Sequence, residues 1–303
     1  GNFDPADIPP TMQWWLRQYS RQIAAAREAG VASFNASSIN RESIEPLVTT
    51  KWNQSTPFND ECPDFSGNKA MTGCLATALA QIVNYHKWPK EHGNGIYEYT
   101  YKKRTFTFDY ENTTFDWDNM LDEYIHGEYT PEQAQAVATL MHGVGVGLDM
   151  MYGTSASGAY SFSVARALIE NFGFDNGAAY RKREYYTDRQ WNDLVYDELS
   201  TGRPVLYCGV DPQGGHAFVC DGYSENEYFH INWGWGGMSD GYYMLSALNP
   251  TQQGIGGSLV GYGFNYYQDI VTGIRPPKEA SPLFIPMYAM GELHTTPYTD
   301  EAS

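Results

Sequence analysis

The sequence of 303 residues contains no hydrophobic run near the 18 residues of a membrane-spanning helix, and its first residues lack the features of a signal peptide. Basic residues are also scarce, because 19 Lys and Arg stand against 36 Asp and Glu and give a formal net charge of −17. This charge opposes binding to a phosphate backbone, so we expect no nucleic-acid partner. The lack of a long hydrophobic run means that we also expect no membrane span. With 42% hydrophobic and 15% aromatic residues, the chain can nevertheless bury a full core.

Cysteines are few, and metal-binding motifs are lacking. The four cysteines, at positions 62, 74, 208 and 220, show no CxxC spacing and are too few for a disulfide scaffold, although a Cys208–Cys220 bridge stays open. There is no HExxH motif, no histidine pair with metal-ligand spacing, and no complete calcium loop. We therefore predict no metal.

Three regions differ in composition. Residues 1–42 contain a predicted helix over 12–26, with prolines before it and glycine after it, followed by a small, polar linker. Residues 43–276 form the dense body of the sequence. Residues 277–303 are rich in proline and lack periodicity, which predicts an extension or a linker.

The body changes from helical to strand patterns along its length. Apolar periodicity predicts helices over 74–86, 131–141 and 163–172. Short β-branched or aromatic runs separated by glycine predict strands over 204–210, 216–221, 228–233 and 241–245. Helices followed by antiparallel strands indicate the α+β class.

One cysteine and one histidine are placed for nucleophilic catalysis. Cys74 opens a predicted helix, where the helix dipole and free backbone N–H groups lower the pKa of a thiol. His86 is too far along that helix to reach it, about 18 Å away. His216 follows 142 residues later, a separation found in peptidases with a Cys–His pair. Gly73 and Gly215, directly before these two residues, leave room for a substrate backbone.

A hairpin predicts a third group. If residues 222–226 form the turn, His216 lies opposite Asn232 or Trp233 on the next strand. Asn232 would then accept a hydrogen bond from the imidazole, and the indole of Trp233 would shield that bond from water. By the same register His230 opposes Phe218, which predicts a structural role for this histidine.

Several segments together resemble the streptopain-like cysteine peptidases, a family with a papain-like fold. The matching segments are residues 52–59, 73–82 with the sequence GCLATALAQI, 167–173, 214–219, 232–241 with NWGWGGMSDG, and 247–250. The resemblance covers about residues 46–276. It implies a helical subdomain that carries the nucleophile and an antiparallel β subdomain that carries the histidine.

The resemblance also implies roles for individual residues. Cys74 is expected as the nucleophile and His216 as general base and acid, with Gln54 donating to the oxyanion. The loop with Ser157, Gly158 and Ser161 is expected to line the pocket for a hydrophobic substrate residue just upstream of the P1 residue, which itself directly precedes the scissile bond.

Family members are bacterial, secreted or at the cell surface, and mature by self-cleavage of an N-terminal propeptide. Residues 1–42 therefore resemble the last helix and linker of such a propeptide, which would be a partner of the body besides the protein or peptide substrates. No cofactor is expected beyond reducing conditions that keep Cys74 as a thiol. The sequence leaves the oligomeric state and the physiological substrate open.

Two alternatives remain. The same Cys–His pair would serve a transglutaminase or cell-wall amidase, which differs in the acyl acceptor. A binding protein without activity would use the 24 tyrosines and 8 tryptophans as an interaction surface.

Overall fold

The computed structural model describes residues 41–257 and 262–278, together with residues 13, 16, 17, 20, 21 and 24. The chain divides into two compact units, Gly1–Arg41 and Glu42–Ser303. In the first unit the six described residues from 13 to 24 are helical, as the sequence predicted for 12–26. The rest of that helix and linker, and residues 279–303 of the proline-rich extension, lie outside the described residues.

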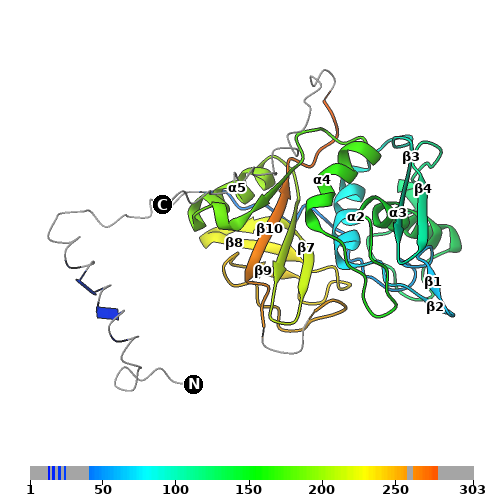
Figure 1. Cartoon of the computed structure of the whole chain (residues 1–303). Helices are drawn as coiled ribbons and strands as arrows, with labels where there is room; N and C mark the ends of the chain where they lie inside the picture. Colours follow the sequence, from blue (N-terminus) through cyan, green and yellow to red (C-terminus); the bar gives the residue numbers. More distant parts are fainter. Residues whose placement is uncertain are drawn as a thin grey trace, which may run out of the picture. The chain divides into compact units, whose positions relative to one another are not determined.

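A six-stranded antiparallel sheet dominates one half of the second unit (Figure 1). Its strand order is β5-β10-β6-β7-β8-β9. The strands are β5 (Ala179–Lys182), β6 (Val205–Val210), β7 (Gly215–Ser224), β8 (Tyr228–Asn232), β9 (Gly241–Tyr243) and β10 (Tyr266–Thr272). Strand β7, which carries His216, therefore lies inside the sheet, paired with β6 on one side and β8 on the other.

The other half contains the long helices and two small hairpins. The long helices are α2 (Cys74–His86) and α3 (Pro131–Gly147), and the hairpins are β1 (Asp64–Phe65) with β2 (Asn68–Lys69) and β3 (Ile96–Tyr101) with β4 (Arg104–Asp109). Short helical segments complete it: η1 (Trp117–Asn119), η2 (Ser161–Ser163), α4 (Val164–Arg166) and the π-helical η3 (Ala167–Asn171). On the sheet side lie η4 (Arg183–Tyr185), α5 (Asp188–Ser200) and η5 (Glu225–Glu227).

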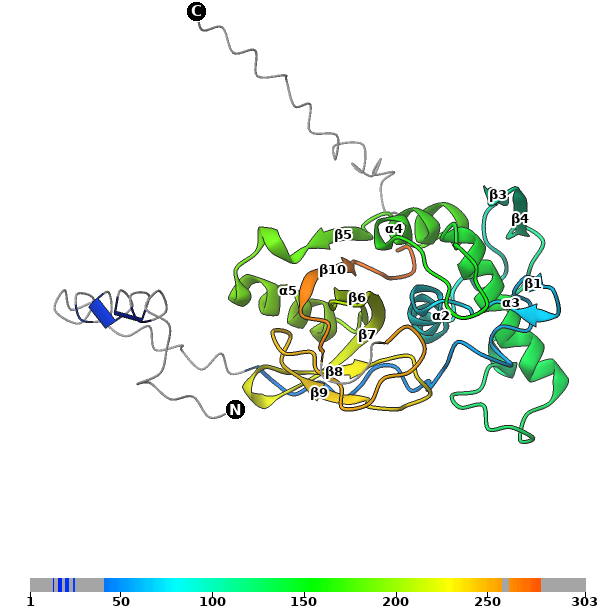
Figure 2. The same ribbon diagram turned by 60° about the horizontal axis from the view of Figure 1, so that its bottom comes forward.

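Helix α2 joins the two halves, because it packs on β6 and β7 as well as on α3 (Figure 2). Strand residues alternate between two apolar clusters, as period-two side chains must. Ala217 and Val219 of β7 join the cluster of α2 and α3, whereas Phe218 and Cys220 join the cluster of Trp191 on α5. The first turn of α2 thus lies against the sheet next to the strand that carries His216.

The α+β class and the papain-like arrangement are confirmed. Helix α2 has the predicted bounds, and the four predicted strands exist. Helix α3 extends six residues beyond the predicted end, and the predicted helix over 163–172 is divided among η2, α4 and η3. The elements that were missed include α5, the β1–β2 and β3–β4 hairpins, β5 and β10. Helix α5 is amphipathic and starts with a capping box formed by Thr187 and Gln190, a signal that the sequence does contain.

Candidate active site

Cys74 is the first residue of α2, and glycine before it makes this start possible. Gly73 adopts φ 91° and ψ 139°, a conformation that residues with a side chain rarely adopt. A Cβ atom at this position would lie 2.8 Å from Met150 Sδ and 3.0 Å from the Ser157 carbonyl oxygen. The backbone before the thiol is therefore packed so closely that only glycine fits.

The Cys74 thiol lies against strand β7. Backbone groups at Ala217, Leu75 and Cys74 itself lie close enough to the sulfur to lower the pKa of the thiol. Burial has the larger effect and raises the pKa above its ordinary value of 9.0. Because Ala217 directly follows His216, strand β7 brings the nucleophile and the histidine to one place.

His216 is held in a cage of aromatic rings. Its imidazole stacks on the indole of Trp235, with ring centroids 4.5 Å apart, and lies near the rings of Phe218, Trp233 and Phe264. Its Nε2–H donates to the Trp233 carbonyl oxygen over 2.9 Å. Since a carbonyl only accepts, this bond assigns the hydrogen to Nε2 and leaves Nδ1 of the neutral ring as the proton acceptor.

The predicted role of Asn232 is wrong, because the hairpin register differs by three residues. Strand β7 continues to Ser224, so Val219 rather than His216 lies opposite Asn232. The Asn232 amide instead donates to the Thr50 carbonyl over 2.7 Å and interacts with Gln81 of α2. The main-chain carbonyl of Trp233, not the side chain of Asn232, orients the imidazole.

The predicted shielding by Trp233 is shared with a residue that the sequence analysis missed. The Trp233 ring centroid lies 6.3 Å from the imidazole, whereas the Trp235 ring is in direct stacking contact. The two indoles stack 5.5 Å apart across Gly234, whose φ of 71° lies outside the strand conformation, so a period-two pattern could not have indicated Trp235.

Gln54 is buried beside the imidazole and already holds a peptide carbonyl. Its Nε2 donates to the Ile255 carbonyl oxygen over 2.7 Å, and the Trp235 indole N–H donates to the same oxygen over 3.0 Å. A Cβ atom on the next residue, Gly256, would lie 3.4 Å from His216 Nδ1. The main-chain carbonyl oxygen of Gln54 accepts from the Thr72 N–H, and this bond connects Gln54 to the segment before Cys74.

The thiol and the imidazole are not hydrogen-bonded in this structure. His216 Nδ1 is buried and has no hydrogen-bond partner among the described residues. Burial lowers the pKa of His216 to about 4 and raises that of the Cys74 thiol, so both groups are neutral at pH 7. The backbone of Gly256 lies close to Nδ1 of the imidazole, and the thiolate–imidazolium pair stays a prediction.

The predicted substrate-binding residues fall into two groups. The Ser157 carbonyl lies next to Gly73, Gly158 pairs with Met151, and Gly215 is an exposed residue at the start of β7. Ser157 therefore lies next to the residue before the thiol and Gly215 directly precedes the histidine, whereas the role of Gly158 stays a prediction. Ser161 instead lies close enough to Cys208 of β6 and Asp269 of β10 to lower the pKa of both groups.

The remaining cysteines and His230 have structural surroundings. All four cysteines are free, and the open Cys208–Cys220 bridge is not formed: Cys208 lies opposite Ala217, and Cys220 opposite Val205. His230 lies opposite Gly222 and not Phe218, and its Nδ1 contacts the buried carboxylate of Asp221 over 2.7 Å. In the described part of the chain, no three His, Cys, Asp or Glu residues are close enough to hold a metal ion.

A cysteine at the start of a buried helix, facing a sheet that presents a histidine with a free Nδ1, defines a papain-like cysteine peptidase. The family model of the peptidase C10 family matches residues 52–243, and the chain belongs to this family.

Relatives with known names agree with this assignment. The chain is 36% identical to the thiol protease/hemagglutinin PrtT of Porphyromonas gingivalis over 94% of its length, and it spans only 35% of that protein. It is also 36% identical to streptopain of Streptococcus pyogenes, over 91% of this chain and 73% of streptopain.

Two solved structures are similar in fold. Active interpain A of Prevotella intermedia has a TM-score of 0.71 and 41% identity, covering 77% of this chain and 95% of that chain. A fragment of its precursor, prointerpain A, has a TM-score of 0.68 and 37% identity, covering 92% of this chain and 87% of the fragment.

Proposed function

We propose that this chain is a secreted or cell-surface bacterial endopeptidase that cleaves protein substrates with Cys74 and His216. The observation that carries the proposal is the bound carbonyl of Ile255. Gln54 and Trp235 both donate to this main-chain oxygen beside the imidazole, so the site recognises a peptide carbonyl. A substrate carbonyl that replaces Ile255 would meet the same donors.

The residues support the following sequence of steps. When the 254–257 segment moves off the imidazole, His216 Nδ1 takes the proton of the Cys74 thiol, giving the thiolate–imidazolium pair. The thiolate attacks the carbonyl carbon of the scissile peptide bond, and the Cys74 N–H and the Gln54 amide stabilise the oxyanion. His216 then gives its proton to the leaving amine. Water, activated by His216, hydrolyses the thioester and restores the thiol.

The Trp233 carbonyl supports this chemistry by fixing the tautomer of His216. Because it accepts from Nε2–H, Nδ1 carries the lone pair toward the reaction. Ser157, Gly158 and Gly215 are proposed to border the bound substrate, and no cofactor takes part beyond a reductant that keeps the thiol reduced.

Among the described residues, none of the helices has the length and apolar character that a membrane span requires.

Azocasein hydrolysis under reducing conditions tests the proposal. The wild type should cleave, and Cys74→Ala should lose all turnover while it keeps the wild-type circular dichroism spectrum. Cys208→Ser is the matched control, since it removes another partly buried thiol and should retain activity. An epoxide thiol inhibitor should block the wild type. Activity in Cys74→Ala, or loss of activity in Cys208→Ser alone, would contradict the assignment.

Maturation is a second part of the proposal. Residues 1–42 are proposed as the end of a propeptide that the enzyme removes by itself, by analogy with the precursor form of interpain A. Mass spectrometry of stored wild type and Cys74→Ala should show shortening at the N-terminus only in the wild type. Adding wild-type enzyme to Cys74→Ala should restore the cut.

A further inference from the structure

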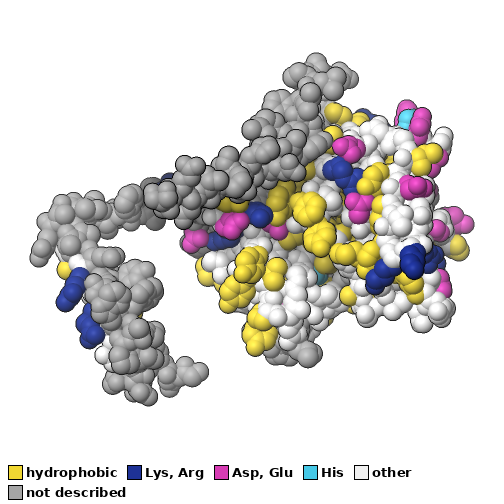
Figure 3. All heavy atoms as spheres, in the orientation of Figure 1, with side chains coloured by type: hydrophobic (Ala, Val, Ile, Leu, Met, Phe, Trp, Pro, Cys, Tyr) yellow, Lys and Arg dark blue, Asp and Glu magenta, His cyan; other side chains and the backbone are white. Residues whose placement is uncertain are grey.

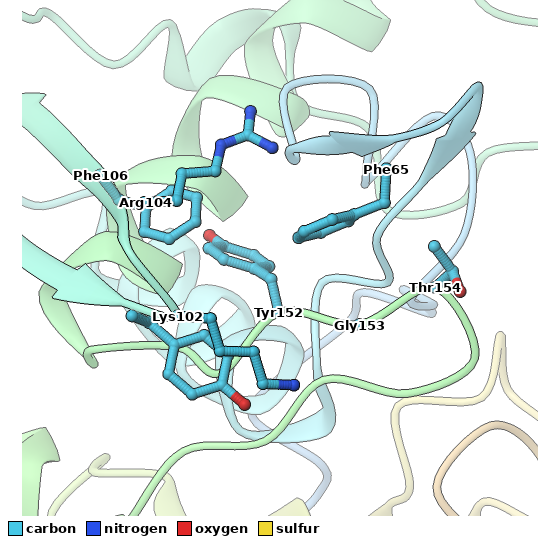
Figure 4. Close-up of a pocket in the computed structure, with 8 residues that line it drawn as sticks. Phe65, Lys102, Arg104, Phe106, Tyr152, Gly153 and Thr154 are labelled. Carbon is cyan, nitrogen blue, oxygen red and sulfur yellow. The ribbon is translucent and has the colours of Figure 1, made fainter.

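A cavity of about 330 Å³ lies between the two small hairpins and the segment after α3 (Figure 4). The walls are mainly aromatic, and two basic side chains stand at its edge. The lining residues are Phe65, Tyr101, Lys102, Arg104, Phe106 and Tyr152, with Gly153 and Thr154. The volume is at the lower end of the range for ligand pockets, and it suits one or two side chains of a peptide.

The basic side chains lie over the aromatic walls. The Arg104 guanidinium lies 5.4 Å from the ring centroid of Phe65 and 5.5 Å from that of Phe106, and Lys102 Nζ lies 5.0 Å from that of Tyr101. Of the described carboxylates, none forms an ion pair with Lys102, Lys103 or Arg104. Figure 3 shows Lys and Arg side chains gathered beside the small hairpins. In a chain of net charge −17, this local excess of positive charge favours an anionic ligand.

The turn that presents these lysines is strained. Tyr101 pairs with Arg104, so Lys102 and Lys103 form a two-residue turn, with φ 47° and 64°. Such a turn favours Asn-Gly, because residues with larger side chains resist positive φ. Strain held by the surrounding structure at a surface turn points to a role for the side chains that cause it.

The cavity is within reach of a substrate in the active site. The Gly153 carbonyl at its edge accepts from the Met71 N–H over 3.0 Å, and Met71 lies within about 11 Å of Cys74 at about 3.6 Å per residue. The Ser157 hydroxyl donates to the Met71 carbonyl and accepts from the Gly153 N–H, so one loop borders both Gly73 and the cavity. An extended peptide needs about four residues to cover this distance.

We propose that the cavity is a distal subsite for the peptide substrate, which takes an acidic residue beside an aromatic residue about four positions upstream of the scissile bond. The aromatic ring would pack among Phe65, Phe106 and Tyr152, and the carboxylate would pair with Lys102 and Arg104. This inference rests on the proposed peptidase function, and on Ser157 and Gly158 bordering the upstream part of the substrate.

Two peptides that share one cleavable core test the subsite. One is extended upstream with Glu-Phe and the other with Lys-Phe, and the core peptide alone is the third substrate. The subsite predicts that kcat/KM favours Glu-Phe by about fivefold, the scale of one or two exposed ion pairs, and that the preference weakens with added salt. Without the subsite, the net charge of −17 favours Lys-Phe, so the two outcomes have opposite signs.

The strained turn provides the decisive variant. Replacing Lys102→Asn together with Lys103→Gly should raise the thermal midpoint, because this sequence fits the turn, and should weaken the preference for Glu-Phe to what Arg104 alone supports. Lys90→Asn is the control, since it removes an exposed positive charge outside the cavity and should keep the preference. The subsite would be overturned by a preference of unchanged size in the double variant, or by equal kcat/KM of the wild type for both extended peptides. Cleavage of the core peptide would still uphold the peptidase.

Binding separates the subsite from catalysis. Inactive Cys74→Ala protein, titrated with the labelled extended peptides, should bind Glu-Phe more tightly than Lys-Phe. If no peptide, including the core, is cleaved by the wild type, the peptidase proposal fails. Tighter binding of Lys-Phe to Cys74→Ala would overturn the subsite independently of any cleavage.

Discussion

The thiol and the imidazole are positioned in opposite ways. The backbone at Cys74 is set by the residue before it: Gly73 supplies the conformation from which α2 begins, and Met150 and Ser157 leave room for glycine alone. His216 depends on partners up to 48 residues away, including Trp233, Trp235 and Phe264. The nucleophile is thus fixed by local sterics, whereas the base is fixed by sheet register and ring packing.

This difference determines how each side tolerates change. A helix start can be disturbed only by changes near it, but a one-residue slip in a sheet turns every side chain to the other face. Three substitutions probe first the residue that contacts both sides, then the thiol side, and finally the histidine side.

Substitution of Gln54 should give the largest loss of kcat, because its side-chain amide is the donor expected at the oxyanion. This amide donates to the Ile255 carbonyl, and the main chain of Gln54 is bound to Thr72. Gln54→Ala should lower kcat by about 100- to 1000-fold, the usual cost of losing one oxyanion donor. Gln54→Glu, which keeps the shape but loses the N–H donors, should fall to a similar level. Steady-state kinetics on one peptide checks this, and full activity of Gln54→Glu would remove Gln54 from the oxyanion site.

Gly73→Ala should have the next largest effect, and it acts on the thiol side. The new Cβ would collide with Met150 and the Ser157 carbonyl, so we expect a stability loss of about 1–3 kcal/mol and a clear drop in kcat. Gly67→Ala is a matched control, because Gly67 has φ 87° and a Cβ atom added there would meet no atom within 4 Å. Gly67→Ala should lose stability through backbone strain alone and should keep the wild-type kcat. Equal losses of kcat in Gly67→Ala and Gly73→Ala would refute the steric explanation.

Asp240→Asn should have the smallest effect, and it acts on the histidine side. The Asp240 carboxylate accepts from the Trp233 N–H over 2.9 Å, and the carbonyl of Trp233 holds His216. Burial raises the pKa of Asp240 from 3.8 to about 6, opposed by the bond from Trp233 and by the charges of His230 and Lys51, while Asp221 raises it further.

The sign of the pH effect follows from this raised pKa. The folded protein holds the proton more tightly than the unfolded chain, so the contribution to stability is present below pH 3.8 and is lost as the pH rises through about 6. Asparagine does not titrate. The thermal midpoint of the wild type should therefore fall relative to Asp240→Asn between pH 4 and pH 7. If the midpoints of the wild type and Asp240→Asn change in parallel across this range, Asp240 does not titrate there. The kcat of Asp240→Asn should differ from that of the wild type by less than about threefold.

The sequence predicted the local features of the site better than the long-range ones. The bounds of α2 followed from glycine, apolar periodicity and Pro89, all of which act within a few residues. The partner of His216 did not follow, because the strand continues three residues into the predicted turn and a bulge lies between Cys220 and Gly222. The β3–β4 hairpin was missed since its Lys-Lys turn carries no turn signal.

The burial of α2 has a consequence for its dynamics. Every residue from Leu75 to Asn84 is buried, and the helix packs against α3 as well as against β6 and β7. Its amide hydrogens should therefore exchange with solvent only when the whole unit unfolds, whereas the amides of residues 254–257 should exchange through small local openings. The helix that carries the nucleophile then has the full cooperative stability of the fold, and access to the site can change without loosening it.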